Sequence, residues 1–291
     1  MSTHVRKPDW LKVKFPAGEN YARIDRYHRV NGLNSVCRSA ACPNQGECWS
    51  KGTATFMILG TTCSRHCRFC NVDSGQLLPP DPAEPAKVAT AIAELKLKHA
   101  VITTVTRDDL PDGGAGHFVD LIREIRKRSD CRIELLISDL QGNWEALDAI
   151  IAEKPDILGH NVETVPRLYA DVRPEADYRR TLQLLAEVRK RQPEVITKSG
   201  LMLGLGETEA EVLQVMSDLR DHGCQLLTLG QYLAPTRDHA PVQRYVEPRE
   251  FTAYAEKGQA LGFEHVESGP LVRSSYHAEE QLDACRSDQH G

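Results

Sequence analysis

The chain has 291 residues, of which 41% are hydrophobic and 26% are charged, and its net charge at pH 7 is −5. This length suits one large α/β domain or two small ones, and the composition is typical of a globular protein that buries a core. The acidic balance gives no general electrostatic case for binding nucleic acid or an anionic membrane, and no apolar stretch approaches the ~20 residues that span a bilayer.

Residues 1–52 show no regular hydrophobic period and are rich in proline and glycine. Residues 1–10 lack the apolar region of a secretory signal, which predicts a cytoplasmic protein. In that compartment thiols stay reduced, and clustered cysteines bind metal more often than they form disulfides. We therefore expect an extension with short helical pieces, ordered by whatever Cys37, Cys42 and Cys48 bind.

Strands and helices alternate from residue 53 onward. Short β-branched runs predict six strands, at 53–59, 100–105, 132–137, 156–160, 195–203 and 225–229. Apolar residues at helical spacing predict helices at about 88–95, 118–128, 144–152, 164–170, 178–191, 208–219 and 248–261. This alternation predicts an α/β fold with a parallel sheet, a partial (β/α)6 barrel of the TIM type. The expected divisions are an N-terminal extension (1–52), the barrel (53–262) and a C-terminal segment (263–291).

A cysteine run follows the first predicted strand, at the end of the barrel where chemistry takes place. Cys63, Cys67 and Cys70 have the spacing C-x3-C-x2-C. Thiolates suit iron–sulfur clusters and zinc, and a cubane cluster takes four ligands, so three cysteines would leave one iron open. The alternative is a structural zinc site with His66 as the fourth ligand, although zinc sites usually pair C-x2-C with a distant second pair.

This run, with Phe69 before its last cysteine, resembles the cluster motif of radical S-adenosylmethionine (SAM) enzymes. The resemblance implies a 4Fe–4S cluster whose open iron binds the amino and carboxylate groups of SAM. It also implies cleavage of SAM to methionine and a 5′-deoxyadenosyl radical, on a partial barrel that agrees with the strand count. Phe69 is then expected near the adenine, and ordinary core packing is the alternative for this residue alone.

A second cysteine run, Cys37, Cys42 and Cys48, lies upstream with the spacing C-x4-C-x5-C. This triplet resembles that of lipoyl synthase, where it holds an auxiliary 4Fe–4S cluster; a zinc site is the alternative. Further segments are similar to the same family: TRDDLPDGGA (106–115), HNVETVPRLY (160–169), KSGLMLGLGE (198–207), GQYLAP (230–235) and RSSY (273–276). The resemblance covers about residues 8–280, with no departure at a motif position.

The auxiliary cluster needs a fourth ligand, which in that family is a serine hydroxyl from the R-S-S-Y segment. This position corresponds to Ser274, with Ser275 as its nearest rival. Serine oxygen is a harder and poorer ligand for iron than thiolate, so such a bond can be released during turnover. Without the family match, two serines near a C-terminus would be interpreted as solvated loop residues.

Polar residues after several strands are candidates for binding the cofactor at the same face of the barrel. The resemblance favours Asn161 and Glu163 after the fourth strand and Gly204 and Glu207 after the fifth. Lys198 and Arg273 are candidates for a carboxylate or for the charge of a cluster. The alternatives are a helix cap for Glu163, a tight turn for Gly204 and a surface position for the two cations.

Two other groups of residues follow from the sequence. Asp108, Asp109 and Asp112 come after the second strand, either near the methionine amino group or as a solvated acidic turn. The remaining three cysteines are assigned to no metal: two are expected to be small buried hydrophobes and one to be free in the polar tail, namely Cys131, Cys224 and Cys285.

Taken together, the resemblance implies lipoyl synthase activity. Two sulfur atoms from the auxiliary cluster would enter C6 and C8 of an octanoyl group amide-linked to a carrier lysine. Unactivated C–H bonds have no acid–base route, so a cofactor must carry this step. Expected partners are octanoylated lipoyl carrier domains (E2 subunits of 2-oxoacid dehydrogenases and the glycine-cleavage H protein) and an electron donor such as ferredoxin or flavodoxin.

Two alternative functions remain. The first is another radical SAM sulfur-inserting enzyme, related to biotin synthase or to methylthiotransferases. Biotin synthase lacks the upstream triplet, and we expect the 36 residues before Cys37 to be too few for the separate N-terminal domain of a methylthiotransferase. The second is a non-enzymatic module that binds zinc or passes electrons, which would be expected to complete both clusters with four cysteines.

Overall fold

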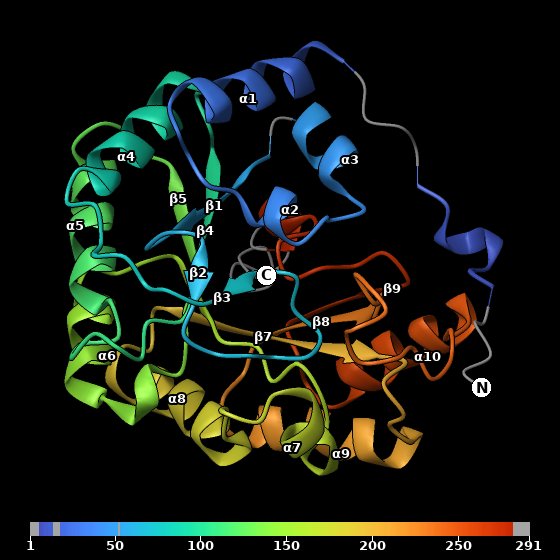
Figure 1. Cartoon of the computed structure of the whole chain (residues 1–291). Helices are drawn as coiled ribbons and strands as arrows, with labels where there is room; N and C mark the ends of the chain where they lie inside the picture. Colours follow the sequence, from blue (N-terminus) through green and yellow to red (C-terminus); the bar gives the residue numbers. More distant parts are fainter. Residues whose placement is uncertain (1–5, 14–17, 52, 282–291) are drawn as a thin grey trace, which may run out of the picture.

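The computed structural model describes residues 6–13, 18–51 and 53–281, and a sheet of seven parallel strands forms its centre (Figure 1). The strands lie in chain order across the sheet: β1 (Thr55–Ile58), β4 (His99–Thr104), β5 (Arg132–Leu136), β6 (Ile157–Gly159), β7 (Ile196–Leu203), β8 (Leu226–Gln231) and β9 (His265–Gly269). Because parallel strands in sequential order need crossover connections, all of their carboxyl ends meet at one face. Among the described residues no pairing joins β1 to β9, so the predicted partial, open α/β barrel is confirmed.

Helices in the crossovers cover the outer side of this sheet (Figure 1). They are α4 (Glu84–Glu94), α5 (Ala115–Arg126), α6 (Trp144–Ala152), α7 (Tyr169–Val172), α8 (Tyr178–Arg191), α9 (Glu209–Asp221) and α10 (Pro248–Ala260), with 3-10 turns η2 (Leu140–Gly142) and η3 (Pro166–Leu168). The predicted helices are confirmed within a few residues, except that the helix expected at 164–170 is the turn η3 followed by the four-residue α7. Thr208 and Glu211 form the predicted capping box of α9.

The seventh strand was missed by the sequence analysis. β9 pairs with β8, with His265 opposite Leu226, and lies in the range assigned to the C-terminal segment. Only Val266 among its five residues is buried. Such a weakly apolar edge strand lacks the alternation that identifies strands in a sequence.

The N-terminal extension is more helical than predicted. It contains η1 (Asp9–Leu11), α1 (Glu19–Val30), α2 (Val36–Ser39) and α3 (Gln45–Ser50). The ring of His28 in α1 stacks between Trp49 of α3 and Phe56 of β1, with centroids 5.3 Å from each. The Asn34 carbonyl accepts a hydrogen bond from the Met57 N–H at 3.0 Å. The extension therefore packs onto the β1 end of the sheet.

Other sequence expectations concern the remaining cysteines and membrane spans. Cys131 and Cys224 are buried, as predicted, whereas Cys285 lies outside the described residues. None of the helices in the part of the chain that the structure describes is long and apolar enough to cross a membrane.

A buried histidine connects the end of β6 to α8. Nδ1 of His160 lies 2.9 Å from the Ile137 carbonyl oxygen, and Nε2 lies 3.1 Å from Oγ1 of Thr181. Burial is the largest cause that lowers the pKa of His160 from 6.5 to about 4, and the positive charge of Arg173 is the second-largest. The imidazole is therefore neutral in the folded protein well below the pH at which it becomes protonated in the unfolded chain.

We expect this histidine to make the protein less stable as the pH falls from about 6.5 to about 4. The unfolded chain takes up the proton first, so the free energy of unfolding falls by about 2 kcal/mol between pH 7 and pH 5 from this residue. Urea unfolding of the wild type and of His160→Gln at both pH values measures this contribution. An equal loss of stability in the two proteins would contradict the assignment.

Candidate active site

The second cysteine triplet lies in a loop whose two ends pair with each other. β2 (Thr62–Cys63) and β3 (Asp73–Ser74) form a two-stranded parallel pair, with Cys63 opposite Ser74. Inside the loop, the Cys70 N–H donates to the Cys67 carbonyl oxygen at 3.0 Å. The pairing closes the loop just beyond the carboxyl end of β1, where the sequence predicted the triplet.

The three thiols are close enough to influence one another. Burial raises the pKa of Cys67 to about 12 and that of Cys70 to about 11, and the thiolate of Cys63 adds to both shifts. The N–H groups of Arg65 and Thr106 donate to Sγ of Cys63, at 3.5 and 3.3 Å. Such buried thiols lose their protons when a metal binds. Three soft donors in one short loop, whose charges act on one another, fit an iron–sulfur cluster with a three-cysteine shell.

The zinc alternative loses its fourth ligand in this structure. The His66 side chain is 66% exposed, and its Nδ1 lies 3.1 Å from Oε1 of Glu175. Within residues 6–13, 18–51 and 53–281, no three His, Cys, Asp or Glu side chains form a group that could hold a single metal ion. His66 thus pairs with a glutamate at the surface.

Phe69 is half-buried and packs against a small apolar cluster. Its neighbours there include Leu205, which follows β7, and Tyr232, which follows β8. The ring thus connects the cysteine loop to strand ends on the other side of the sheet. Core packing is therefore present, and a contact with adenine stays a prediction.

The first triplet forms a similar group of thiols on the N-terminal extension. Cys37 lies in α2, Cys48 in α3 and Cys42 between them, where its N–H donates to the Cys37 carbonyl oxygen at 3.0 Å. Burial raises the pKa of Cys42 to about 11 and that of Cys48 to about 12. The negative charge of the Cys37 thiolate is the second-largest cause of both shifts. These three soft donors fit a second cluster.

Residues 270–277 of the C-terminal segment contact the N-terminal extension near the first triplet and Asn161 after β6. Nδ2 of Asn44 donates to the Leu271 carbonyl oxygen at 2.5 Å, and the Tyr276 hydroxyl donates to Oε1 of Glu47 at 3.2 Å. The donor Asn44 and the acceptor Glu47 both belong to the N-terminal extension and are close in sequence to Cys42 and Cys48. The guanidinium of Arg273 acts electrostatically on both Cys42 and Glu163, and burial lowers its pKa. The segment that carries Ser274 and Ser275 is therefore fastened next to the first triplet.

Two predicted residues, Asn161 and Ser274, meet directly. Nδ2 of Asn161 donates to Oγ of Ser274 at 2.7 Å and to Oε1 of Glu163 at 3.0 Å. Burial raises the pKa of Glu163, and the charge of Arg173 opposes this rise. Glu163 has a φ of +63°, a conformation that costs a non-glycine residue about 1–3 kcal/mol and is common at functional sites.

Arg173 was missed by the sequence analysis. Only 6% of it is exposed, and its guanidinium donates to the carbonyl oxygens of Asn161 and Val162 at 2.8 and 3.0 Å. Its Nε is buried without a hydrogen-bond partner, and its charge acts on Cys67. The surrounding sequence, DVRPEAD, is polar and gives no signal that one of its residues points inward.

The turn after β7 is built by Gly204 and Glu207. The Glu207 carboxylate accepts hydrogen bonds from the N–H groups of Gly204 and Leu205 at 2.6 and 2.9 Å. Gly204 has a φ of +101°, and a Cβ there would lie 2.2 Å from Nε2 of Gln231. Both residues therefore shape the tight turn that was the alternative interpretation, and a role in cofactor binding stays a prediction.

Lys198 lies apart from the other predicted cofactor residues. It is in the amino-terminal half of β7, where Nζ lies 2.7 Å from Oε1 of Glu134, and both side chains are 3% exposed. His99 lies 3.1 Å from the other carboxylate oxygen of Glu134. A buried ammonium needs a counter-charge, and this pairing holds Lys198 inside the barrel. The structure therefore corrects the expectation that Lys198 lies with the cofactor residues at the carboxyl ends of the strands.

The three aspartates after β4 all have partners. Asp109 pairs with Arg107 at 2.7 Å, and Asp108 pairs with Arg65 at 2.6 Å. The Asp112 carboxylate accepts hydrogen bonds from the N–H groups of Gly114 and Gly116 at 2.9 and 2.8 Å. The solvated acidic turn is thus replaced by an anchored loop.

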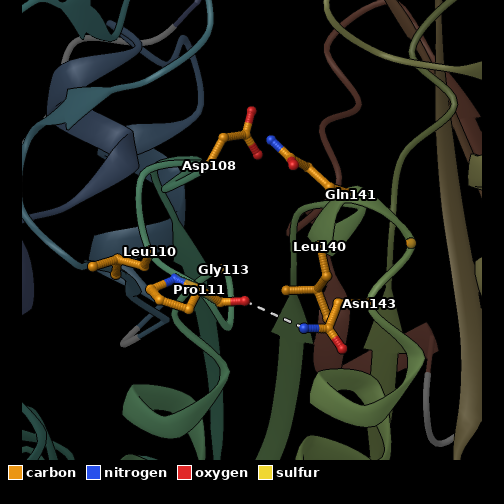
Figure 2. A pocket seen from close by; sticks show the side chains of 8 residues that line it. Asp108, Leu110, Pro111, Gly113, Leu140, Gln141 and Asn143 are labelled. Carbon is orange, nitrogen blue, oxygen red and sulfur yellow. Dashed lines mark hydrogen bonds between the residues drawn. The ribbon is translucent and has the colours of Figure 1, made fainter.

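A cavity of about 250 Å³ opens between this loop and the loop after β5. Figure 2 shows Asp108 and Gln141 pointing toward each other across it, with Leu140 and Pro111 further in. Nδ2 of Asn143 donates to the Pro111 carbonyl oxygen at 3.3 Å and connects the two loops. The cavity therefore lies at the catalytic face of the barrel.

Gly230 of β8 leaves room for the C-terminal segment. A Cβ on this residue would lie 2.1 Å from the Val272 carbonyl oxygen, which is backbone and cannot rotate away. The glycine thus allows the chain that leads to Ser274 to approach the sheet.

We expect Gly230→Ala to displace the C-terminal segment and to destabilise the protein by about 1–3 kcal/mol, because the added methyl overpacks this contact. Thermal unfolding and the rate of limited proteolysis near residue 272 measure the effect. Gly269→Ala is the matched control, since its Cβ would lie 3.3 Å from Cγ2 of Val272, the end of a side chain that can move. Equal behaviour of the two variants would refute the explanation.

The sheet and its cysteine loop define a member of the radical SAM superfamily, and residues 57–219 match the family of that description. HydG, a maturase of the FeFe-hydrogenase, has a similar fold: TM-score 0.56 at 15% identity, over 78% of this chain and 61% of that chain. The lipoyl synthase of Caldanaerobacter subterraneus subsp. tengcongensis is 53% identical over 97% of this chain and 99% of its own length. The lipoyl synthase of Methylococcus capsulatus is 56% identical over 95% and 87%. The chain therefore belongs to the lipoyl synthase family.

Proposed function

We propose that this member of the lipoyl synthase family replaces one C–H bond by a C–S bond at C6 and at C8 of an octanoyl group amide-linked to a carrier lysine. The observation that carries the proposal is that the C-terminal segment contacts two parts of the site. It contacts the region of the first triplet through Asn44 and Glu47, and the polar residues after β6 through Asn161. A carbon radical must meet its sulfur donor before it meets solvent, so the two centres need a shared, closed space.

In this proposal the second triplet holds the 4Fe–4S cluster that binds SAM. When bound, these groups would supply the radical chemistry that removes a hydrogen atom from the octanoyl carbon. The N–H groups of Arg65 and Thr106 stabilise the Cys63 thiolate by donating to its sulfur. Cofactor contacts are assigned to Phe69, Asn161, Glu163, Gly204 and Glu207, which follow strand ends or lie in the cysteine loop.

The first triplet and Ser274 hold the auxiliary cluster, which is the sulfur substrate of the reaction. Ser274 is preferred over Ser275 because Asn161 donates to its hydroxyl oxygen and so orients it. An oxygen that accepts a hydrogen bond is a weaker ligand for iron, which suits a bond that breaks when the cluster is consumed.

The carrier substrates are lipoyl carrier domains, such as the E2 subunits of 2-oxoacid dehydrogenases and the glycine-cleavage H protein. Ferredoxin or flavodoxin is the proposed electron donor, and the cytoplasm is the proposed location. The free thiols among the described residues are consistent with this location, because thiols stay reduced in the cytoplasm.

Anaerobic reconstitution with iron and sulfide tests the proposal. The protein is mixed with an octanoyl-lysyl peptide, SAM and a reductant, and the peptide is followed by mass spectrometry. A gain of two sulfur atoms per peptide is expected, together with iron equivalent to two 4Fe–4S clusters. Zinc in both triplets, or a reconstituted protein that adds no sulfur, would overturn the proposal.

A further inference from the structure

Arg65 lies between Cys63 and Cys67, yet its side chain points into the protein and is only 4% exposed. Its Nε and one terminal nitrogen donate to the two carboxylate oxygens of Asp108, at 2.6 and 3.0 Å. The same terminal nitrogen donates to Oδ1 of Asp139 at 2.5 Å. Guanidinium is suited to this task because its planar fork binds carboxylates in a fixed geometry.

The two carboxylates come from successive strand ends. Asp108 follows β4, and its N–H donates to Oγ of Ser64 at 3.1 Å. Asp139 follows β5, is fully buried and is also 3.2 Å from the guanidinium of Arg180. One side chain thus fastens the cysteine loop to the loops after two neighbouring strands, and the polar cavity of Figure 2 adjoins this contact.

We propose that Arg65 is the positioning residue of the second triplet. Its side chain holds the cysteine loop in place, and its positive charge offsets the negative charges of Asp108 and Asp139. The proposal rests on the proposed function, because it assumes that the triplet carries a 4Fe–4S cluster. Without the fork, the loop loosens and the Arg65 N–H no longer points steadily at Sγ of Cys63, 3.5 Å away. The buried Asp139 would also be left with less compensation for its charge.

Both consequences act on the reduction potential in the same direction. Hydrogen bonds to the sulfurs and the local net charge are two of the factors that set the potential of an iron–sulfur cluster. Losing an N–H donor to sulfur, or a positive charge nearby, makes the reduced cluster less stable. Arg65→Gln should therefore shift the midpoint potential to more negative values.

Arg68 provides a matched control in the same loop. It is also an arginine paired with an aspartate, Asp171, but the two side chains are 43% and 68% exposed. Exposed pairs of this kind contribute little, because solvent screens them. Arg68→Gln removes the same charge from the same loop without touching a buried partner.

The experiment uses the reconstituted wild type, Arg65→Gln, Arg65→Lys and Arg68→Gln, and measures two properties of the second-triplet cluster without substrate. The first is its midpoint potential, followed by electron paramagnetic resonance in Cys37→Ala backgrounds that lack the auxiliary cluster. The second is the rate of iron loss to a chelator. We expect a clearly more negative potential and faster iron loss for Arg65→Gln. For Arg68→Gln we expect a much smaller shift in potential, because solvent screens the exposed charge, and the wild-type rate of iron loss. Arg65→Lys should restore the potential in part, because it keeps the charge, but not the rate of iron loss.

If Arg65→Gln does not fold, as judged by its thermal unfolding, Arg65→Lys carries the test through its faster iron loss. An unchanged potential and rate in folded Arg65 variants would overturn the inference while leaving the proposed function intact. A wild-type protein that takes up no iron at Cys63, Cys67 and Cys70 would instead overturn the proposed function, and the inference with it.

Discussion

Cys37→Ala is expected to abolish sulfur insertion while SAM cleavage continues. Cys37 is a buried donor of the first triplet, and its loss leaves the auxiliary cluster with two thiolates and a weak serine oxygen. Even residues behind the ligand shell change metal affinity or activity by about 10–100-fold, so loss of a direct ligand should exceed that. The second triplet, in a separate loop after β1, keeps its three cysteines.

Two assays on one sample separate the activities: 5′-deoxyadenosine formed from SAM, and sulfur gained by an octanoyl-lysyl peptide. Cys131→Ala is the control, because Cys131 is also buried, at 2% exposure against 5% for Cys37, and lies outside both triplets. It should keep both activities. Sulfur insertion by Cys37→Ala at the wild-type rate would show that the first triplet is not the donor site.

Cys63→Ala is expected to abolish both activities. Cys63 lies at the mouth of the cysteine loop, receives two backbone N–H donors and belongs to the pairing of β2 with β3. With this thiolate missing, the cluster that binds SAM loses a third of its protein ligands, so neither 5′-deoxyadenosine nor thiolated peptide should form above background. Iron content should fall by about one cluster per chain, because the first triplet is unaffected.

The contrast with Cys37→Ala is the informative result. If Cys63→Ala still cleaved SAM while Cys37→Ala did not, the roles of the two triplets would be reversed. If both variants lost both activities, the two sites would depend on each other for assembly, and the iron content of each variant would identify the dependent site.

Most of the sheet could be predicted because buried parallel strands and their amphipathic helices leave strong patterns in the sequence. α6 and α8 begin and end at the residues that their apolar spacing indicates. β9 could not be predicted, since an edge strand with one buried residue has no such pattern. α1 was missed because only Ile24 and His28 in it are buried.

The site also contains residues that the sequence could predict and residues that it could not. Spacing predicted that the cysteines of each triplet lie near one another, and the thiols do act on one another electrostatically within both triplets; their role as cluster ligands stays a prediction. Arg65, Asp139 and Arg173 form buried contacts between segments far apart in the chain, which a sequence does not reveal. Lys198 was misplaced because a residue's position within its strand decides whether it reaches the carboxyl end, and the motif alone does not give that position.

In the proposed function the two triplets are unequal: one holds the cluster that serves the radical, and the other holds the cluster that supplies sulfur. The most direct test is to rebuild the clusters with isotopically heavy sulfide and to run one turnover in unlabelled buffer. We expect both sulfur atoms in the peptide to be heavy, and variants of Cys42 and Cys48 to yield no labelled product. Unlabelled sulfur in the product, formed at the same rate, would contradict this expectation.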